Sequence, residues 1–424
     1  MIHPAVAELE QALRQLLLPL PESTRVLVGY SGGLDSTALL FIASRVVPAA
    51  QLCALHINHN LQSMAEEWES HCRQQAQALG VKFNSVHVYP NDASENAARE
   101  ARYSVFESTL GPGDLLLLGH HMDDQAETLL MRLFRGAGAR GLSGIPQRRQ
   151  LGLGSILRPL LATTRDSLES IVKSAGLSWV EDPSNRDSRY LRNWIRQSLG
   201  PALSQCWPDW VSRLSESAEL MSESAKLHRA LALVDADGQF SNPLKIPVEL
   251  AKEPERLANL IYYWLNSHAV RVGSRSQLRG LVQTLSENFP GGSGRWLISD
   301  QAVHLYQGSL WLESVEIPPQ AALDLVLVPG EVDLACGRLG VESGEIGLPQ
   351  GLDVQLRGRQ PGDKVRLAVG HQSVKKFMNE KKIPPWLRDS WPLLVHQGEI
   401  ISIVGVWTAK SQHQPGGLTL KWVR

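Results

Sequence analysis

The string Ser-Gly-Gly-Leu-Asp-Ser at residues 31–36 has the residue types that phosphate chemistry needs. It follows an apolar, β-branched run at 25–31 and opens a helical pattern at 36–46. Glycines let the backbone approach a ligand closely, and the amides at a helix start favour an anion. The two serine hydroxyls can donate to phosphate oxygens, whereas Asp35 would repel bare phosphate and so predicts a bridging cation such as Mg²⁺. The alternative is an ordinary strand–turn–helix connection.

A second string, Gly-His-His-Met-Asp-Asp-Gln-Ala-Glu-Thr, occupies residues 119–128 at another predicted strand-to-helix junction. Asp124 and Glu127 are three residues apart and therefore share one face of the predicted helix. Two carboxylates in this position could bind a metal ion or a cationic substrate. Carboxylates are also favoured in any first helical turn by the helix dipole, which is the alternative explanation.

Further candidates lie at the other strand ends and on basic segments. His56 stands where the predicted strand 51–59 ends, and Arg99 and Arg102 share a face of the predicted helix 94–110. These arginines could hold phosphate or simply be solvated. Arginines also follow the turn-forming string Glu-Asp-Pro-Ser-Asn at 181–185 and accompany glycines at 132–142; such segments suit phosphate contacts, with a solvated basic helix as the alternative.

The elements that would position these residues alternate between strand and helix over the first half of the chain. Apolar strand-like runs at 25–31, 51–59, 82–90 and 115–121 are each followed by a helical pattern. This order predicts an α/β fold with a parallel sheet and helices on both faces, and ligands then bind beyond the carboxyl ends of the strands.

The pattern changes beyond about residue 210. Mainly helical segments follow first, and from about residue 325 short strands alternate with Gly/Pro turns around one basic helix near 373–382. We therefore predict three domains. Their ranges are 1–213 for an α/β catalytic domain, 214–325 for a mainly helical domain and 326–424 for a small α+β domain.

Composition narrows the class of protein, and charge distribution points to a polyanionic partner. The formal net charge is −1 over 424 residues, yet residues 131–213 hold 13 Lys/Arg against 6 Asp/Glu. Residues 351–424 hold 12 against 5, so acidic residues elsewhere mask two basic blocks. The four cysteines form no C-x-x-C pair, which favours a reducing, cytoplasmic setting over a disulfide framework. We expect no membrane span and no membrane partner.

Together these motifs resemble the tRNA(Ile)-lysidine synthetase family, a branch of the N-type ATP pyrophosphatases (the PP-loop superfamily). The resemblance covers 31–36, 119–128, the Arg-Gly-x-Gly segment, the Glu-Asp-Pro-Ser-Asn stretch and a C-terminal module from Leu356 to Trp407. It implies an adenine nucleotide alpha hydrolase-like catalytic domain, a middle domain that contacts tRNA or links the other two, and a tRNA-binding C-terminal domain.

The implied activity is that of a carbon–nitrogen ligase. ATP and Mg²⁺ would be used to adenylate O2 of the wobble cytidine, C34, in an isoleucine tRNA with a CAU anticodon. Free L-lysine would then attack C2, giving lysidine, AMP and pyrophosphate. The partners would be this tRNA and lysine, and a homodimer is left open.

The resemblance also implies roles for individual residues. Asp35 would hold the metal, and Asp124 and Glu127 would bind lysine. The implied catalytic group is Asp35, Asp124, Glu127, Arg99 and Arg102. The implied ATP-binding group is Ser31, Gly32, Gly33, Leu34, Asp35, Ser36, His56 and His120. The implied tRNA-binding group is Arg135, Arg140, Arg192, Asn193, Arg196, Lys375, Lys376, Lys381, Lys382 and Arg388.

Two other functions compete with this one. A tRNA thiolase of the same superfamily would add sulfur after adenylation, but such enzymes generally use paired cysteines or an iron–sulfur cluster. A non-catalytic nucleotide- and RNA-binding protein is the alternative from another class. Asp35, Asp124 and Glu127 are more than binding alone needs.

Overall fold

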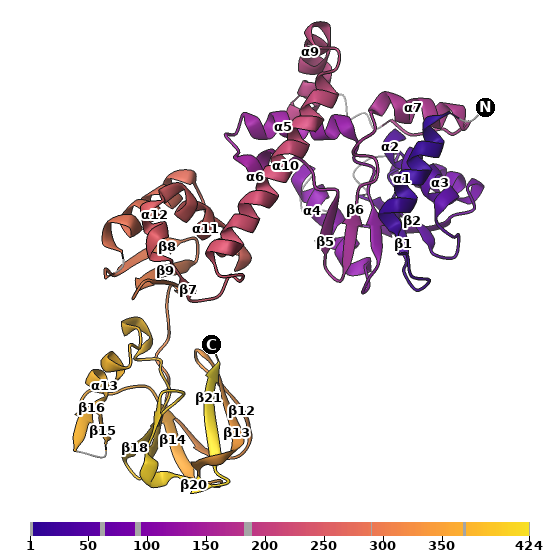
Figure 1. The fold of residues 1–424 in the computed structure, drawn as a ribbon. Helices are drawn as coiled ribbons and strands as arrows, with labels where there is room; N and C mark the ends of the chain where they lie inside the picture. Colours follow the sequence, from indigo (N-terminus) through magenta and orange to yellow (C-terminus); the bar gives the residue numbers. More distant parts are fainter. Residues whose placement is uncertain are drawn as a thin grey trace. The chain divides into compact units, whose positions relative to one another are not determined.

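A computed structural model describes residues 3–59, 64–89, 95–181, 189–289, 291–367 and 370–423, with the side chains of 95 and 96 left out. The chain divides into two units, 1–228 and 229–424, which we describe separately. Figure 1 shows the course of the chain through both.

The first unit is built on a six-stranded sheet with the order β3-β2-β1-β4-β6-β5. The first four strands of the chain and β6 run parallel, and β5 is antiparallel to β6 at the edge. The bounds are β1 Val26–Gly29, β2 Leu52–Asn58, β3 Lys82–His87, β4 Leu115–Leu117, β5 Arg148–Leu151 and β6 Gly154–Leu157. The hairpin β5–β6 was not predicted from the sequence, since its short strands carry little periodicity.

Two hydrophobic cores lie on opposite faces of this sheet, because successive strand residues point to opposite sides. Val26 and Val28 of β1 belong to the core that α1, α2, α3 and α7 cover. Leu27 belongs to the other core, with Phe106 and Leu110 at α4 and its end. The predicted parallel sheet with helices on both faces is therefore confirmed. The helix bounds are α1 Ala5–Leu17, α2 Leu34–Val46, α3 Ala65–Ala78, α4 Glu95–Thr109, α5 Met122–Leu133, α6 Ala139–Leu142 and α7 Arg165–Ser174.

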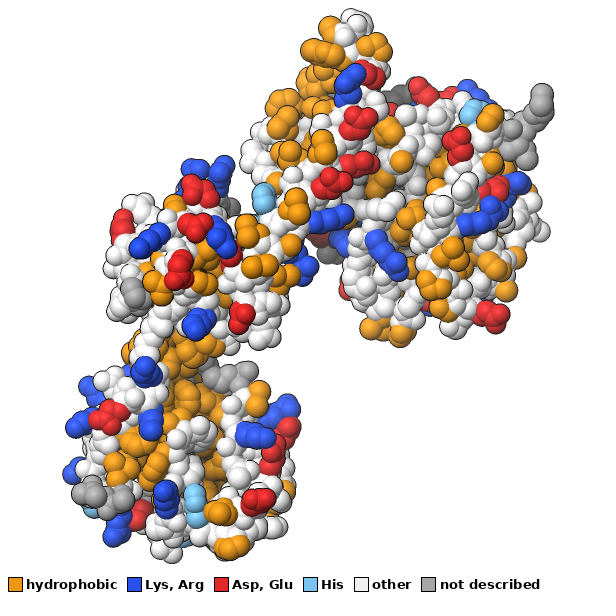
Figure 2. Space-filling model, viewed as in Figure 1, with side chains coloured by type: hydrophobic (Ala, Val, Ile, Leu, Met, Phe, Trp, Pro, Cys, Tyr) orange, Lys and Arg blue, Asp and Glu red, His pale blue; other side chains and the backbone are white. Residues whose placement is uncertain are grey.

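Short helices and one long helix follow the sheet. They are α8 Leu191–Trp194, the π-helical turn η2 Ile195–Leu199, α9 Gly200–Cys206 and α10 Trp210–Asp235. Along α10, Leu220, Leu227, Leu231 and Val234 are exposed, and their spacing of seven, four and three residues places them on one helical face. Figure 2 shows hydrophobic side chains along α9 and α10.

The second unit begins with helices packed on a small antiparallel sheet of order β7-β10-β9-β8. Its core centres on the fully buried Trp264. The bounds are β7 Leu244–Lys245, η3 Val248–Lys252, α11 Pro254–Ser267, α12 Arg275–Asn288, β8 Gly294–Ile298, β9 Gln301–Tyr306 and β10 Ser309–Ser314. The helical character predicted for this region is confirmed, and the sheet accompanies it.

Two sheets make up the rest of the second unit. One joins β11, β14, β17, β18, β15 and β16, with β19 beside β18, and the other joins β12, β13, β20 and β21. The bounds are β11 Leu323–Val326, β12 Gly330–Leu334, β13 Gly337–Leu348, β14 Asp353–Arg357, β15 Lys364–Arg366, β16 His371–Ser373, α13 Val374–Glu380, η4 Pro385–Leu387, β17 Leu393–His396, β18 Glu399–Ile403, β19 Trp407–Thr408, η5 Lys410–Gln412, β20 Gln414–Pro415 and β21 Leu418–Val423. The predicted strand-rich α+β character is confirmed.

None of the helices in the described ranges combines the length and the apolar character that crossing a bilayer would take.

Candidate active site

The glycine-rich string forms a closed turn between β1 and α2. The Ser31 amide donates to Ser36 Oγ at 3.2 Å, and the two serine hydroxyls lie 3.1 Å apart. Gly32 has a φ of +83°, and a Cβ there would lie 2.5 Å from Cys72 Sγ, so only glycine fits this position. The turn leads directly into the N-terminus of α2, which is the kind of position that suits an anion.

Gly119 brings the second string against this turn. A Cβ on Gly119 would lie 3.0 Å from the backbone oxygen of Asp35 and 3.2 Å from the Ser36 amide nitrogen. The ends of β1 and β4 are neighbours in the sheet, so the two strings meet at one sheet edge as the parallel order requires.

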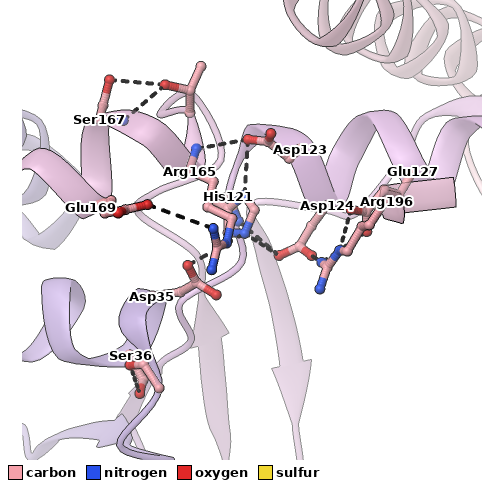
Figure 3. Close-up of polar contacts among 12 residues, drawn as sticks. Asp35, Ser36, His121, Asp123, Asp124, Glu127, Arg165, Ser167, Glu169 and Arg196 are labelled. Atoms are coloured by element: carbon pink, nitrogen blue, oxygen red, sulfur yellow. Dashed lines mark hydrogen bonds and ion pairs between the residues drawn. The ribbon is translucent and has the colours of Figure 1, made fainter. Parts of the chain in front are cut away.

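His121 is surrounded by carboxylates at this junction, as Figure 3 shows. Its Nδ1 is 3.3 Å from Asp123, and its Nε2 is 3.6 Å from Asp35 and 3.7 Å from Asp124. Burial lowers the pKa of His121, but its interactions with the carboxylates of Asp123, Asp35 and Asp124 outweigh this effect and raise the pKa to about 10. The ring is therefore an imidazolium that links the phosphate turn to α5.

Asp35 has the properties expected of a metal-holding carboxylate. Its Oδ1 is buried and has no hydrogen-bond partner in the part of the chain that the structure describes. Among the same residues, no group of three or more His, Cys, Asp or Glu side chains could hold a metal ion. A Mg²⁺ ion fits here only if ATP oxygens complete its oxygen shell, which is how this ion is usually bound.

Asp124 and Glu127 lie together on α5, as predicted, and both are buried. Arg196 donates to Asp124 at 2.8 Å and to both oxygens of Glu127, while Arg192 Nε is 2.9 Å from Glu127. Burial alone would raise the pKa of Asp124, but the charges of His121, Arg192 and Arg196 have the larger effect and hold the pKa below its ordinary value. Burial raises the pKa of Glu127, and Arg196 opposes this without cancelling it.

The residues predicted to bind tRNA in the first unit are divided by the structure. Arg192 and Arg196 face the carboxylate pair, and Asn193 between them is buried. Arg135 and Arg140 are exposed at the end of α5 and on α6. Arg135 and Arg140 thus form an exposed basic surface. Arg192 and Arg196 instead belong to a charge cluster with the buried Asp124 and Glu127, and the sequence had not paired these arginines with the carboxylates.

The remaining ATP and catalytic candidates lie near the strand ends. His56 is buried and its Nδ1 is 2.9 Å from the Tyr30 carbonyl oxygen, so this nitrogen carries the proton. His120 is half-buried beside His121, and its Nδ1 accepts a hydrogen bond from Arg158 at 3.3 Å. Arg99 lies over the Tyr103 ring, and Arg102 is exposed on α4.

Exposed lysines mark the basic surface of the C-terminal domain. Lys375 and Lys376 lie on α13, with Lys381 and Lys382 directly after it. A hollow of about 830 Å³ nearby is lined by Arg359, Lys364 and Lys375, among others. Unlike these lysines, Arg388 is not exposed.

Arg388 is buried and donates to the Ile383 carbonyl and to Asn379 Oδ1, both at 2.9 Å. Its position favours a structural role, although the residue type and the neighbouring lysines had indicated RNA contact.

Three family models match consecutive parts of the chain. A PP-loop domain matches residues 5–203, a TilS substrate binding domain matches 244–311, and a TilS substrate C-terminal domain matches 354–422. The tRNA(Ile)-lysidine synthase of Pseudomonas syringae pv. tomato is 37% identical over 94% of this chain and 92% of its own length. The chain belongs to the tRNA(Ile)-lysidine synthase family.

A second relative, the tRNA(Ile)-lysidine synthase of Alkalilimnicola ehrlichii, is 37% identical over 94% of both chains. Among solved structures, the U34-tRNA thiolase NcsA of Methanococcus maripaludis is similar at 16% identity and a TM-score of 0.42, over 51% of this chain and 78% of that one. As a lysidine synthase family member with a PP-loop domain, the chain is an ATP-using enzyme of the ligase type that modifies tRNA.

Sequence reasoning missed residues that hold the site of this lysidine synthase family member together. Gln125, Arg132 and Arg158 all donate to backbone carbonyls of the segment 141–146. Gln125 and Arg132 stand inside strings noted in the sequence, but nothing there indicates these bonds, since the partners lie 9 to 20 positions away. The Glu-Asp-Pro-Ser-Asn string occupies 181–185, and its last four residues lie outside the described residues. Val180, just before the string, donates to the Gly32 carbonyl at 2.9 Å.

Proposed function

We propose that this enzyme ligates free L-lysine to C2 of C34 in a CAU-anticodon isoleucine tRNA. The observation that carries the proposal is the continuous polar line from Asp35 through His121 to Asp124 and Glu127. It joins a phosphate-binding turn to a pair of buried carboxylates, and an ATP-dependent ligation of a cationic amine needs both.

The first step uses the turn at 31–36. O2 of the cytosine attacks the α-phosphorus of ATP, the P–O bond to the β-phosphate breaks, and pyrophosphate leaves. The amides and hydroxyls of the turn bind the phosphate oxygens and hold them for in-line attack. Asp35, whose Oδ1 makes no hydrogen bond among the described residues, would hold Mg²⁺, which when bound neutralises charge on the departing pyrophosphate.

The second step uses the charge cluster on α5. Lysine carries ammonium groups and a carboxylate, and the cluster offers both carboxylates and guanidinium groups in one buried place. Asp124 and Glu127 would receive the ammonium while Arg192 and Arg196 turn to the lysine carboxylate. Until lysine arrives, the arginines keep the buried carboxylates compensated.

The lysine amine must lose a proton before it attacks C2 and expels AMP. Glu127 suits this task best among the groups present, because burial raises the pKa of its carboxyl above the ordinary value. The base is splayed from a single-stranded anticodon loop, as is usual where proteins read RNA. The basic C-terminal surface would hold the body of the tRNA through its phosphates.

Cys72, the cysteine beside the turn at 31–36, argues against the thiolase alternative. Cys72 is buried under Gly32, and burial raises the pKa of its thiol to about 12, so it offers no thiolate for sulfur transfer.

The proposal also includes three domains, with the ranges 1–213, 214–325 and 326–424, and a homodimer. The apolar face of α10 is the surface that a second copy would cover.

The deciding experiment incubates the enzyme with isotope-labelled lysine, ATP, Mg²⁺ and isoleucine tRNA bearing CAU, followed by mass analysis of the nucleosides. We expect a lysine-bearing cytidine, with AMP and pyrophosphate released in equal amounts. The same tRNA with a CAA anticodon is the control. If the labelled amine never appears on cytidine, the proposal is wrong.

A further inference from the structure

Two histidines at the strand ends present opposite protonation patterns. Nδ1 of His56 lies 2.9 Å from the Tyr30 carbonyl oxygen. Because a carbonyl oxygen only accepts hydrogen bonds, Nδ1 of His56 must be the donor and carries the proton. Arg158 presents Nε to Nδ1 of His120 at 3.3 Å, and a guanidinium only donates. His120 therefore has a lone pair on Nδ1, and a neutral His120 ring carries its proton on Nε2.

Arg158 is held firmly enough to impose this pattern. It follows β6, beside β4 in the sheet, and only 3% of its surface is exposed. Nη1 donates to the Pro146 carbonyl at 2.7 Å, and its backbone amide donates to the Gln147 carbonyl at 2.9 Å. The guanidinium is thus held by Pro146 on one side and His120 on the other, and turning away from the ring would leave a buried donor unpaired.

The surroundings of His120 favour the neutral ring. Burial is the largest effect and lowers the pKa of His120 to about 4, and the charges of Arg158, Arg192 and Arg99 act in the same direction against that of Asp124. His120 thus differs from its neighbour His121, which is charged. The charges of Asp124 and Arg192, which belong to the carboxylate–arginine cluster on α5, therefore act on His120 as well.

We propose that Arg158 is a positioning residue that keeps the proton of His120 on Nε2, so that His120 meets a ligand oxygen as an uncharged hydrogen-bond donor. The ligand oxygen belongs to ATP, and this half of the inference rests on the proposed function. A phosphate oxygen accepts hydrogen bonds, so a neutral His120 can bind it through Nε2 only if that nitrogen carries the proton. Arg158 itself does not touch the substrate.

Nuclear magnetic resonance of the full chain labelled with ¹⁵N-histidine tests the tautomer directly, because protonated and unprotonated ring nitrogens have well-separated shifts. The His120 signals are assigned by their loss in His120→Gln. We expect Nε2 of His120 to be protonated and Nδ1 unprotonated, and His56 to show the reverse. A His120 ring protonated on Nδ1 in the unaltered chain would overturn the proposal without any variant of Arg158.

Variants then test whether Arg158 is the cause. Arg158→Met should mix the tautomers of His120, and Arg158→Lys, which still donates, should restore the Nε2 form. Arg132→Met is the matched control, since Arg132 also donates to carbonyls of the 141–146 segment but bonds no histidine. A tautomer shift of equal size in Arg132→Met would mean that loop packing, and not Arg158, sets the ring.

Pyrophosphate release gives the functional readout. Arg158→Met and His120→Leu should each lower kcat about tenfold or more, as expected for a lost hydrogen bond in the reaction. His120→Gln, which keeps an N–H at the Nε2 position, should lose less. The double variant should be no slower than the worse single one; additive losses would overturn the coupling. If the labelled-lysine assay fails while the histidine tautomers are as expected, the proposed function is wrong and the assignment of the His120 tautomer still holds.

Discussion

Arg196 grips the Glu127 carboxylate through Nε at 2.5 Å and through Nη2 at 3.0 Å. The pair is buried on the carboxylate side, where Glu127 is 3% exposed. A bidentate bond of this kind fixes both position and orientation. The two residues are 69 positions apart in the chain, so the candidate lysine site forms only when the segment after residue 189 has packed on α5.

Replacing Glu127 by Gln should separate the two chemical steps. The amide keeps the shape and one acceptor for Arg196 but removes the negative charge, so binding of the lysine ammonium weakens. We expect kcat/KM for lysine to fall about tenfold or more, while lysine-independent pyrophosphate release changes little. Steady-state kinetics with each readout measures this. Glu169→Gln, which removes a half-buried carboxylate paired with Lys173, is the control.

Asp35→Asn should abolish pyrophosphate release rather than tRNA binding. The variant keeps the side-chain volume but loses the charge that would hold the metal, and we expect a loss of at least ~100-fold in kcat. Binding of tRNA without ATP should stay within about twofold of the unaltered enzyme. Asp166→Asn, in the exposed first turn of α7, serves as control. Undiminished pyrophosphate release in the Asp35 variant would favour the non-catalytic alternative.

Removing four lysines of the C-terminal domain should weaken tRNA binding in a salt-dependent manner. In the combined Ala variant of Lys375, Lys376, Lys381 and Lys382, the dissociation constant should rise. The slope of log K against log salt should flatten by up to ~0.9 for each phosphate that the variant no longer neutralises. Filter binding over a salt series measures both. Lys410 and Lys421, exposed on the same domain, provide a double-Ala control. An unchanged tRNA affinity would show that these lysines are only solvated.

His304 predicts a loss of stability in mild acid within the second unit. Its ring stacks on Trp386 at a centroid distance of 4.1 Å. Burial, and then the charge of Arg295, lowers the pKa of His304 to about 4, below the ordinary value of about 6.5. The folded state therefore disfavours the proton, and stability that is present above pH ~6.5 is lost progressively as pH falls toward 4.

Urea unfolding followed by tryptophan fluorescence between about pH 7.5 and about pH 5 tests this. His304→Phe keeps the stacked ring and should remove part of the pH dependence, whereas His413→Phe, at an exposed position, should not. Equal pH dependence in all three proteins would exclude His304 as its source.

Local pattern was sufficient for the first four strands of the sheet and for the carboxylate pair, but not for the hairpin β5–β6. The strand–helix alternation predicted the parallel order, because each apolar run is short and bounded, and the spacing of Asp124 and Glu127 placed both on one face of α5. The family resemblance then supplied the class of activity, ATP-dependent modification of tRNA, which the lysidine synthase relatives support.

Interactions between segments distant in sequence were beyond such reasoning. Arg192 and Arg196 looked like a basic helix, and nothing in their spacing indicates that they bond carboxylates more than 60 positions earlier. Arg388 was predicted to contact RNA like its lysine neighbours, yet its side chain is buried and donates hydrogen bonds to groups inside the domain. These outcomes depend on which segments meet in space, and one sequence carries no direct record of that.

The close approach at Gly119 has a practical consequence for protein engineering. A side chain at position 119 would crowd the backbone of Asp35 and Ser36, so the two strings pack closely despite the intervening 80-odd residues. A designer who transplants the turn at 31–36 onto another scaffold should therefore carry the strand end at 119–121 with it. Conversely, Gly119→Ala would push on the turn and should perturb ATP use without altering any side chain of the turn.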